Sequence, residues 1–178
     1  MQIYAIADLH LSLTSEKPMD VFGEAWRGHA EKLERNWRER VQADDLVLVP
    51  GDISWAMQLS AALPDLSFIG NLPGKKILLK GNHDYWWSAI GRVRSLLPAG
   101  MRAIQNDAIV EDGIGICGTR GWLCPGSNNF SAEDQKIYLR ELDRLTLSLN
   151  ALPEVQKKIA MLHFPPFLDR DRGSGFTE

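Results

Sequence analysis

Short apolar runs alternate with longer segments of helical periodicity, and this alternation restricts the fold more than any other feature of the chain. Buried strands are expected at Gln2–Ala7, Leu46–Val49, Lys76–Leu79 and Ile159–Leu162. Helices are expected over Asp20–Val41, Trp55–Ile69, Tyr85–Leu97 and a long segment capped by Ser131. This βαβαβα order predicts an α/β fold with a largely parallel sheet that antiparallel strands later join.

Two local signals refine this prediction. Pro64 favours a break or a fresh start within the second helix, because proline lacks the N–H that a helix needs. Within Arg102–Gly118, three short apolar stretches are separated by Asn106-Asp107 and Asp112-Gly113, which are dipeptides typical of hairpin turns. Tyr85-Trp86-Trp87 supplies at least one core aromatic side chain and a candidate wall for a substrate pocket.

Composition limits the class of protein. The 178 residues, 44% hydrophobic and 24% charged, are typical of a single globular domain. The net charge of −3 argues against a nucleic-acid binder. No apolar run reaches the roughly 18 residues that cross a bilayer, and Met1–Ile6 does not resemble a signal peptide. Together with two cysteines at no metal or redox spacing, Cys117 and Cys124, this predicts a cytoplasmic protein with reduced thiols.

Residue types that bind metals follow four of the expected strands. They are found in the loops Asp8-Leu9-His10, Gly51-Asp52 and Gly81-Asn82-His83-Asp84 and at His163. In open α/β sheets, ligands bind outside the carboxyl ends of the strands, so we expect these loops to converge on one crevice. Carboxylates, imidazoles and an amide without thiolates suit Mn²⁺, Fe or Zn²⁺. The alternative for each residue alone is an ordinary loop or helix cap.

Asp52 is the natural bridge between two cations. Cations held about 3.5–4 Å apart repel each other, and a shared carboxylate offsets that repulsion. Gly51 permits the tight turn that would direct Asp52 into the crevice. A bridged pair would lower the pKa of a shared water and then stabilise the phosphoryl oxygens in the transition state.

These motifs, in this order, resemble those of the calcineurin-like metallophosphoesterases. The resemblance implies two packed mixed β-sheets flanked by helices, and hydrolysis of phosphoester bonds by in-line attack of a hydroxide that bridges two divalent ions. It implies that Asp8 and His10 bind the first metal, that Asp52 bridges both, and that Asn82 and His163 bind the second.

The resemblance also implies that His83 donates a proton to the leaving oxygen, oriented by a nearby carboxylate such as Asp84. From the residues alone, Arg120 is a candidate for binding the substrate phosphate, because glycines on both sides free its backbone. A surface ion pair is the equally weighted alternative for this arginine.

One departure from the family pattern matters. The chain lacks the family's last motif, Gly-His-x-His, which leaves about three protein ligands for each metal. We therefore expect a single domain over residues 1–178 that is truncated at its C-terminus and binds metal weakly. The last strands of the second sheet would be missing, and the exposed edge would favour self-association.

The expected substrate is a phosphorylated small molecule, a nucleotide or a phosphoprotein. The main alternative is a scaffold protein that keeps the fold and some metal ligands but has lost turnover. A nuclease of the same superfamily is a third hypothesis, which the net charge disfavours.

Overall fold

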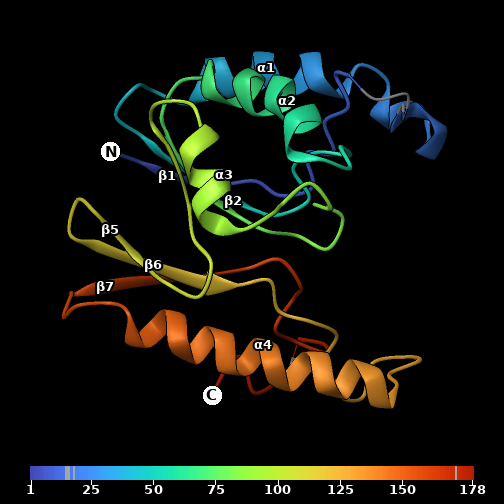
Figure 1. Ribbon diagram of the computed structural model, residues 1–178, viewed down its shortest axis with the longest axis vertical. Helices are drawn as coiled ribbons and strands as arrows, with labels where there is room; N and C mark the ends of the chain where they lie inside the picture. Colours follow the sequence, from blue (N-terminus) through green and yellow to red (C-terminus); the bar gives the residue numbers. More distant parts are fainter. Residues whose placement is uncertain (15–16, 18, 171) are drawn as a thin grey trace. The chain divides into compact units, whose positions relative to one another are not determined.

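The computed structural model describes residues 1–14, 17, 19–170 and 172–178. Contacts between Cα atoms divide the chain into two compact units, Met1–Ala103 and Ile104–Glu178. Each unit contains one β-sheet (Figure 1). No helix in the described ranges is long and apolar enough to cross a membrane.

The first unit is built on a parallel four-stranded sheet. Its strands are β1 (Ile3–Ala5), β2 (Leu46–Pro50), β3 (Lys75–Leu79) and β4 (Met101–Ala103), in that spatial order. Parallel neighbours require crossover connections, and α1 (His29–Arg40), α2 (Leu59–Gly70) and α3 (Ile90–Leu96) supply them. β2 and β3 are buried over nearly their whole length, as expected of central strands covered on both faces.

The predicted helix at Asp20–Val41 is shorter in the structure. Two short 3₁₀ turns, Met19–Phe22 and Glu24–Trp26, precede α1. Gly23 and Gly28 separate these pieces with φ angles of 126° and 60°, which lie outside the right-handed helical region. The apolar spacing predicted a helix correctly only after the second glycine.

α2 and α3 begin later than predicted, because the residues before them form loops, the first held by a tertiary hydrogen bond and the second by a local turn. The Trp55 N–H donates to the Leu11 carbonyl at 2.9 Å, and the Trp87 N–H donates to the Asp84 carbonyl at 3.1 Å. The break predicted at Pro64 is wrong, since this proline lies inside α2. Trp86 and Trp87 are buried in the core, whereas Tyr85 is 56% exposed.

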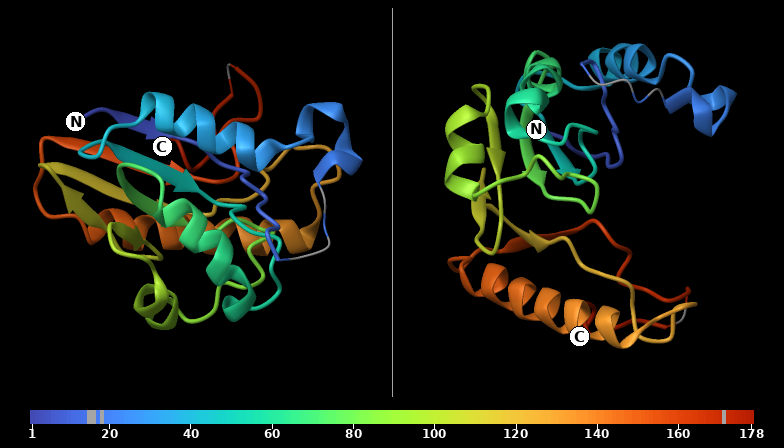
Figure 2. Two further views of the ribbon diagram at one scale, coloured as in Figure 1. Left: turned by 90° about the horizontal axis from the view of Figure 1, so that it is seen from above. Right: turned by 45° about the vertical axis from the view of Figure 1, so that its right-hand side comes forward.

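The second unit contains a mixed sheet of β5 (Ile109–Glu111), β6 (Ile114–Thr119) and β7 (Lys157–Leu162). β5 and β6 form the predicted antiparallel hairpin at Asp112-Gly113, where both φ angles are positive. β6 and β7 are parallel, and α4 (Ala132–Asn150) connects them and packs on β6 (Figure 2).

The hairpin predicted at Asn106-Asp107 is wrong. β4, which precedes this dipeptide, pairs in parallel with β3 in the first unit, and β5, which follows it, belongs to the second. The predicted N-cap of α4 is confirmed, since the Ser131 hydroxyl accepts a hydrogen bond from the Asp134 N–H at 3.2 Å in a capping box. The two sheets and the helices that connect their strands confirm the predicted α/β fold.

Candidate metal centre

The loops after β1 and β2 run side by side and bring three candidate ligands together. The Asp8 N–H donates to the Gly51 carbonyl at 3.1 Å, and the His10 N–H donates to the Asp52 carbonyl at 2.9 Å. His10 Nε2 lies 3.8 Å from Asp8 Oδ1 and 3.6 Å from Asp52 Oδ2. Each residue of this trio thus offers one ligand atom, and these atoms all lie within 4.8 Å of one another.

All three residues of the trio have left-handed backbones. Their φ angles are 58° at Asp8, 43° at His10 and 53° at Asp52. Residues other than glycine rarely adopt this region, and such conformations cluster at functional sites. Gly51 has a φ of 98°, which confirms the tight turn predicted before Asp52.

The third loop packs directly against Asp52. The His83 N–H donates to Asp52 Oδ1 at 2.8 Å. A Cβ atom at Gly81 would lie 2.1 Å from Asp52 Oδ1 and 2.3 Å from the Asp52 nitrogen, so only glycine fits there. Asn82 stands between Gly81 and His83 in the chain, so it belongs to the loop that borders the trio. Its side chain is half-buried.

Asp84 is fully buried and connects the second and third loops. One carboxylate oxygen, Oδ2, accepts hydrogen bonds from the N–H groups of Asp52 and Gly81 at 2.9 and 2.8 Å. The other, Oδ1, accepts from the backbone of Ile53 at 2.8 Å and of Ser54 at 3.3 Å, and from the Trp86 indole at 2.9 Å. None of these five bonds comes from His83, the residue that Asp84 was expected to orient.

Burial is the main influence on the ionisation of Asp84. Desolvation raises the pKa of its carboxyl, and the nearby charge of Asp52 acts in the same direction. The backbone hydrogen bonds from Gly81, Ile53 and Ser54 lower the pKa and partly offset the effect of burial. Whatever its ionisation, Asp84 links the second loop to the third through hydrogen bonds to the backbone of both.

Aromatic rings surround the two histidines of this centre. Trp55 stacks on His10 with ring centroids 4.6 Å apart and an interplanar angle of 22°. The same indole lies 5.0 Å from the His83 ring, and the Tyr85 ring meets His83 edge-on at 6.1 Å. The rings of His10 and His83 are 5.8 Å apart, so His83 lies beside the trio. Nothing in the sequence marked Trp55 as part of this site except its place three residues after Asp52.

His163 and Arg120 belong to the second unit. They follow β7 and β6, and the N–H groups of His163 and Phe164 both donate to the Arg120 carbonyl, at 3.1 and 2.9 Å. The Arg120 guanidinium forms an ion pair with the buried Glu141 at 3.3 Å and lies 4.5 Å from the Trp122 ring centroid. The ion pair considered as the alternative for Arg120 is thus present, with a buried partner.

Comparison with known proteins identifies the family. The family model of calcineurin-like phosphoesterases matches residues 1–178. The chain belongs to the calcineurin-like phosphoesterase family. No curated protein matches it.

Two solved structures share the fold of this calcineurin-like phosphoesterase. One is the protein of unknown function AQ665 from Aquifex aeolicus, with a TM-score of 0.51 and 17% identity, where the match covers 98% of this chain and 84% of that one. The other is the phosphopantetheinyl hydrolase PptH from Mycobacterium tuberculosis, with a TM-score of 0.52 and 16% identity, covering 93% of this chain and 69% of that one. At these identities the likeness shows the fold alone.

Divalent metal ions are implied for a calcineurin-like phosphoesterase, and the trio fits them. Two carboxylates and one imidazole converge within 4.8 Å, and this donor set suits Mn²⁺, Fe or Zn²⁺. Asp52 is buried, only 3% exposed, and its two carboxylate oxygens lie against the His83 N–H and His10 Nε2, which fixes the position of this oxygen donor.

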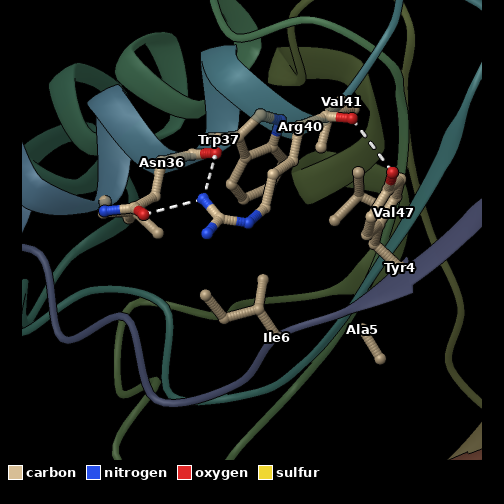
Figure 3. Close-up of a pocket in the computed structure, with 9 residues that line it drawn as sticks. Tyr4, Ala5, Ile6, Asn36, Trp37, Arg40, Val41 and Val47 are labelled. Carbon is tan, nitrogen blue, oxygen red and sulfur yellow. Dashed lines mark hydrogen bonds between the residues drawn. The ribbon is translucent and has the colours of Figure 1, made fainter.

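Three cavities of the first unit differ in whether their lining includes residues of the trio or neighbours of His83. One of about 310 Å³ includes Asp8 together with Trp26, His29 and Lys32. Another of about 290 Å³ includes Tyr85, the neighbour of His83. A third of about 160 Å³, between α1 and β1, is lined mainly by apolar side chains such as Ile6 and contains no candidate ligand (Figure 3). Of these three cavities, the first therefore borders the trio and the second lies beside the neighbour of His83.

Proposed function

We propose that this chain hydrolyses phosphoester bonds in a metal-dependent reaction at the trio of Asp8, His10 and Asp52. Membership of the calcineurin-like phosphoesterase family supports phosphoester hydrolysis in general. The convergence of three strained ligand residues within 4.8 Å is the observation that carries the proposal for this site.

The ligand assignment follows the resemblance of the successive loops to the family's motifs. Asp8 and His10 would hold the first of two ions, Asp52 would be shared, and Asn82 would bind the second. The role of His163, in the second unit, stays a prediction. When bound, divalent ions supply Lewis acidity, which lowers the pKa of water and stabilises charge on phosphoryl oxygens. The hydrogen bond from the His83 N–H to Asp52 Oδ1 leaves Oδ2 of this carboxylate facing His10 Nε2 at 3.6 Å.

His83 is the proposed general acid. Its ring lies beside the trio and contacts Trp55 and Tyr85, which limit its movement. A proton held on this imidazole would pass to the leaving oxygen as the phosphoester bond breaks. Asp84 supports this step indirectly, because its bonds to the N–H groups of Gly81 and Asp52 fix the loop that carries His83.

Phosphorylated small molecules are the substrates that we propose. The solved structure from Mycobacterium tuberculosis is named a phosphopantetheinyl hydrolase, which is consistent with this class. The cavity of about 310 Å³ that includes Asp8, and that of about 290 Å³ that includes Tyr85, are of a size for small-molecule groups.

A metal-titrated assay tests the proposal. The chelator-treated chain should not hydrolyse para-nitrophenyl phosphate or its bis ester, and added Mn²⁺ should restore turnover on at least one of them. The two esters separate monoesterase from diesterase activity. Metal binding without turnover on either ester, or on a panel of phosphorylated small molecules, would favour the scaffold alternative.

A further inference from the structure

The cavity of about 290 Å³ in the first unit lies where α2 and α3 begin. Its polar lining comes from Gln58, Ser60, Tyr85, Ser88 and Arg92. These residues belong to three segments: the start of α2, the loop after β3 and the first turn of α3. The cavity has the size of a subsite for part of a small molecule.

The polar groups of this cavity are available to a ligand. Within the ranges that the structure describes, the side chains of these five residues make no hydrogen bond or ion pair with the protein. Arg92 brings a guanidinium, whose planar set of N–H donors matches a carboxylate or a phosphate. Two hydroxyls, an amide and a phenol add neutral donors and acceptors around it.

Tyr85 joins this cavity to the proposed general acid. Its ring lines the cavity and meets the His83 ring edge-on at 6.1 Å. A general acid protonates the oxygen that leaves, so the leaving alcohol must lie next to it. The rest of the leaving alcohol could therefore extend past Tyr85 into this polar cavity.

We propose that this cavity binds the leaving alcohol of the phosphoester, and that Arg92 selects alcohols that carry an anionic group, either a carboxylate or a second phosphate. The inference rests on the proposed function, since it uses His83 as the acid. Arg35, an exposed arginine of α1 that lines neither this cavity nor the cavity of about 310 Å³ beside Asp8, supplies the matched control.

Kinetics with matched aryl phosphates test the selection. The substrates are 4-carboxyphenyl phosphate, its neutral isostere 4-carbamoylphenyl phosphate, and 1,4-phenylene bisphosphate, which separates the phosphate source from the carboxylate source. We expect kcat/KM to favour at least one anionic substrate over the neutral one by roughly tenfold or more. Arg92→Met should abolish this preference and Arg35→Met should keep it. No preference in the unaltered chain, or the same preference in Arg92→Met, would overturn the inference while leaving the proposed hydrolysis intact.

Binding of the released alcohol tests the cavity independently of turnover. In NMR titrations of the full chain, 4-hydroxybenzoate should bind roughly tenfold more tightly than 4-hydroxybenzamide, and Arg92→Met should remove the difference. Equal affinities in the unaltered chain would overturn the inference. If no aryl phosphate is hydrolysed, the proposed function fails, and this titration still decides whether the cavity selects anions.

Discussion

At the scale of single residues, the backbone conformation of the trio explains how its side chains converge. Positive φ angles at Asp8, His10 and Asp52 turn the chain sharply, at a cost of about 1–3 kcal/mol each. The hydrogen bonds from the Asp8 and His10 N–H groups to the neighbouring loop hold these conformations. Side chains that would otherwise alternate along an extended chain are thereby directed to one point.

Gly81→Ala should displace Asp52 and weaken metal binding. The added Cβ would lie 2.1 Å from Asp52 Oδ1, so the carboxylate must move. We expect Mn²⁺ affinity, measured by calorimetric titration, to fall at least tenfold with a retained circular dichroism spectrum. Gly91→Ala is the matched control, because a Cβ there meets nothing within 4 Å and lies in α3, where alanine stabilises by about 0.5–1 kcal/mol. Unchanged affinity in Gly81→Ala would contradict the geometry of this centre.

Asp84→Asn should destabilise the protein by about 2–4 kcal/mol, because an amide NH₂ cannot accept the hydrogen bonds that one carboxylate oxygen now accepts. Both oxygens are used: Oδ2 by two backbone N–H groups and Oδ1 by three donors. Urea unfolding measures the loss. The exposed Asp143→Asn in α4 should stay within about 0.5 kcal/mol of the unaltered chain. Equal stabilities of the two variants would show that the buried carboxylate does not hold the loops.

His83→Ala should lower turnover by roughly 10²–10⁴-fold while metal affinity stays unchanged, because a general acid acts on the leaving oxygen and does not bind the ion. The loss should be smaller for substrates with good leaving groups, which need less protonation. Elemental analysis gives the metal content and kinetics give the turnover of the same samples, which separates a general acid from a metal ligand. Parallel loss of metal and activity would make His83 a ligand.

The sequence indicated three residues that the structure brings within 4.8 Å of one another, and their roles in metal binding and catalysis stay predictions. Residue types and order were enough to single out Asp8, His10 and Asp52, because metal chemistry restricts ligand types strongly. The five hydrogen bonds of Asp84 and the stacking of Trp55 on His10 depend on loops far apart in the chain. No local pattern records such contacts.

At the scale of elements, the central strands and the start of α4 were predicted closely, whereas the starts of α1, α2 and α3 were not. β2 differs from its prediction by one residue at its end, because a continuous apolar run defines a buried parallel strand. Trp55–Gln58 continues the apolar periodicity of α2 but is a loop, since Trp55 bonds to Leu11. Periodicity reports which face is buried and cannot reveal a tertiary hydrogen bond that replaces a helical one.

β3 contains a buried lysine that should make stability depend on pH. Lys76 is 2% exposed, and its ammonium donates to the carbonyls of Leu72 and Gly70. Burial, followed by repulsion from Arg38, lowers the pKa of Lys76 to about 8 from 10.5. Between these values the unfolded chain binds more protons than the folded one, so the free energy of unfolding rises with pH.

The size of this effect follows from the difference in pKa. From pH 7.5 to pH 10, we expect the unfolding free energy of the unaltered chain to gain about 2 kcal/mol relative to Lys76→Met, measured by urea denaturation. Lys157→Met, at an exposed position of β7, should follow the unaltered chain. If the unfolding free energies of Lys76→Met and the unaltered chain change in parallel with pH, the lowered pKa of Lys76 would be contradicted.

At the scale of the whole molecule, the sequence predicted the family and both sheets, but not the division of the chain after Ala103. The turn at Asn106-Asp107 looked like a hairpin because turn residues are the same whether the chain returns to its own sheet or enters another. Action of both units as one domain and self-association through a sheet edge stay predictions.

The central claim is that Asp8, His10 and Asp52 hold the metal on which hydrolysis depends, and Asp52→Ala tests it most directly. Asp52 is the shared carboxylate of the proposal, so its loss should remove paired metal binding and turnover together. Elemental analysis after Mn²⁺ loading, with para-nitrophenyl phosphate hydrolysis on the same samples, is the measurement. We predict two ions and turnover in the unaltered chain, and fewer ions with no turnover in the variant. Two retained ions and unchanged turnover in Asp52→Ala would contradict the account.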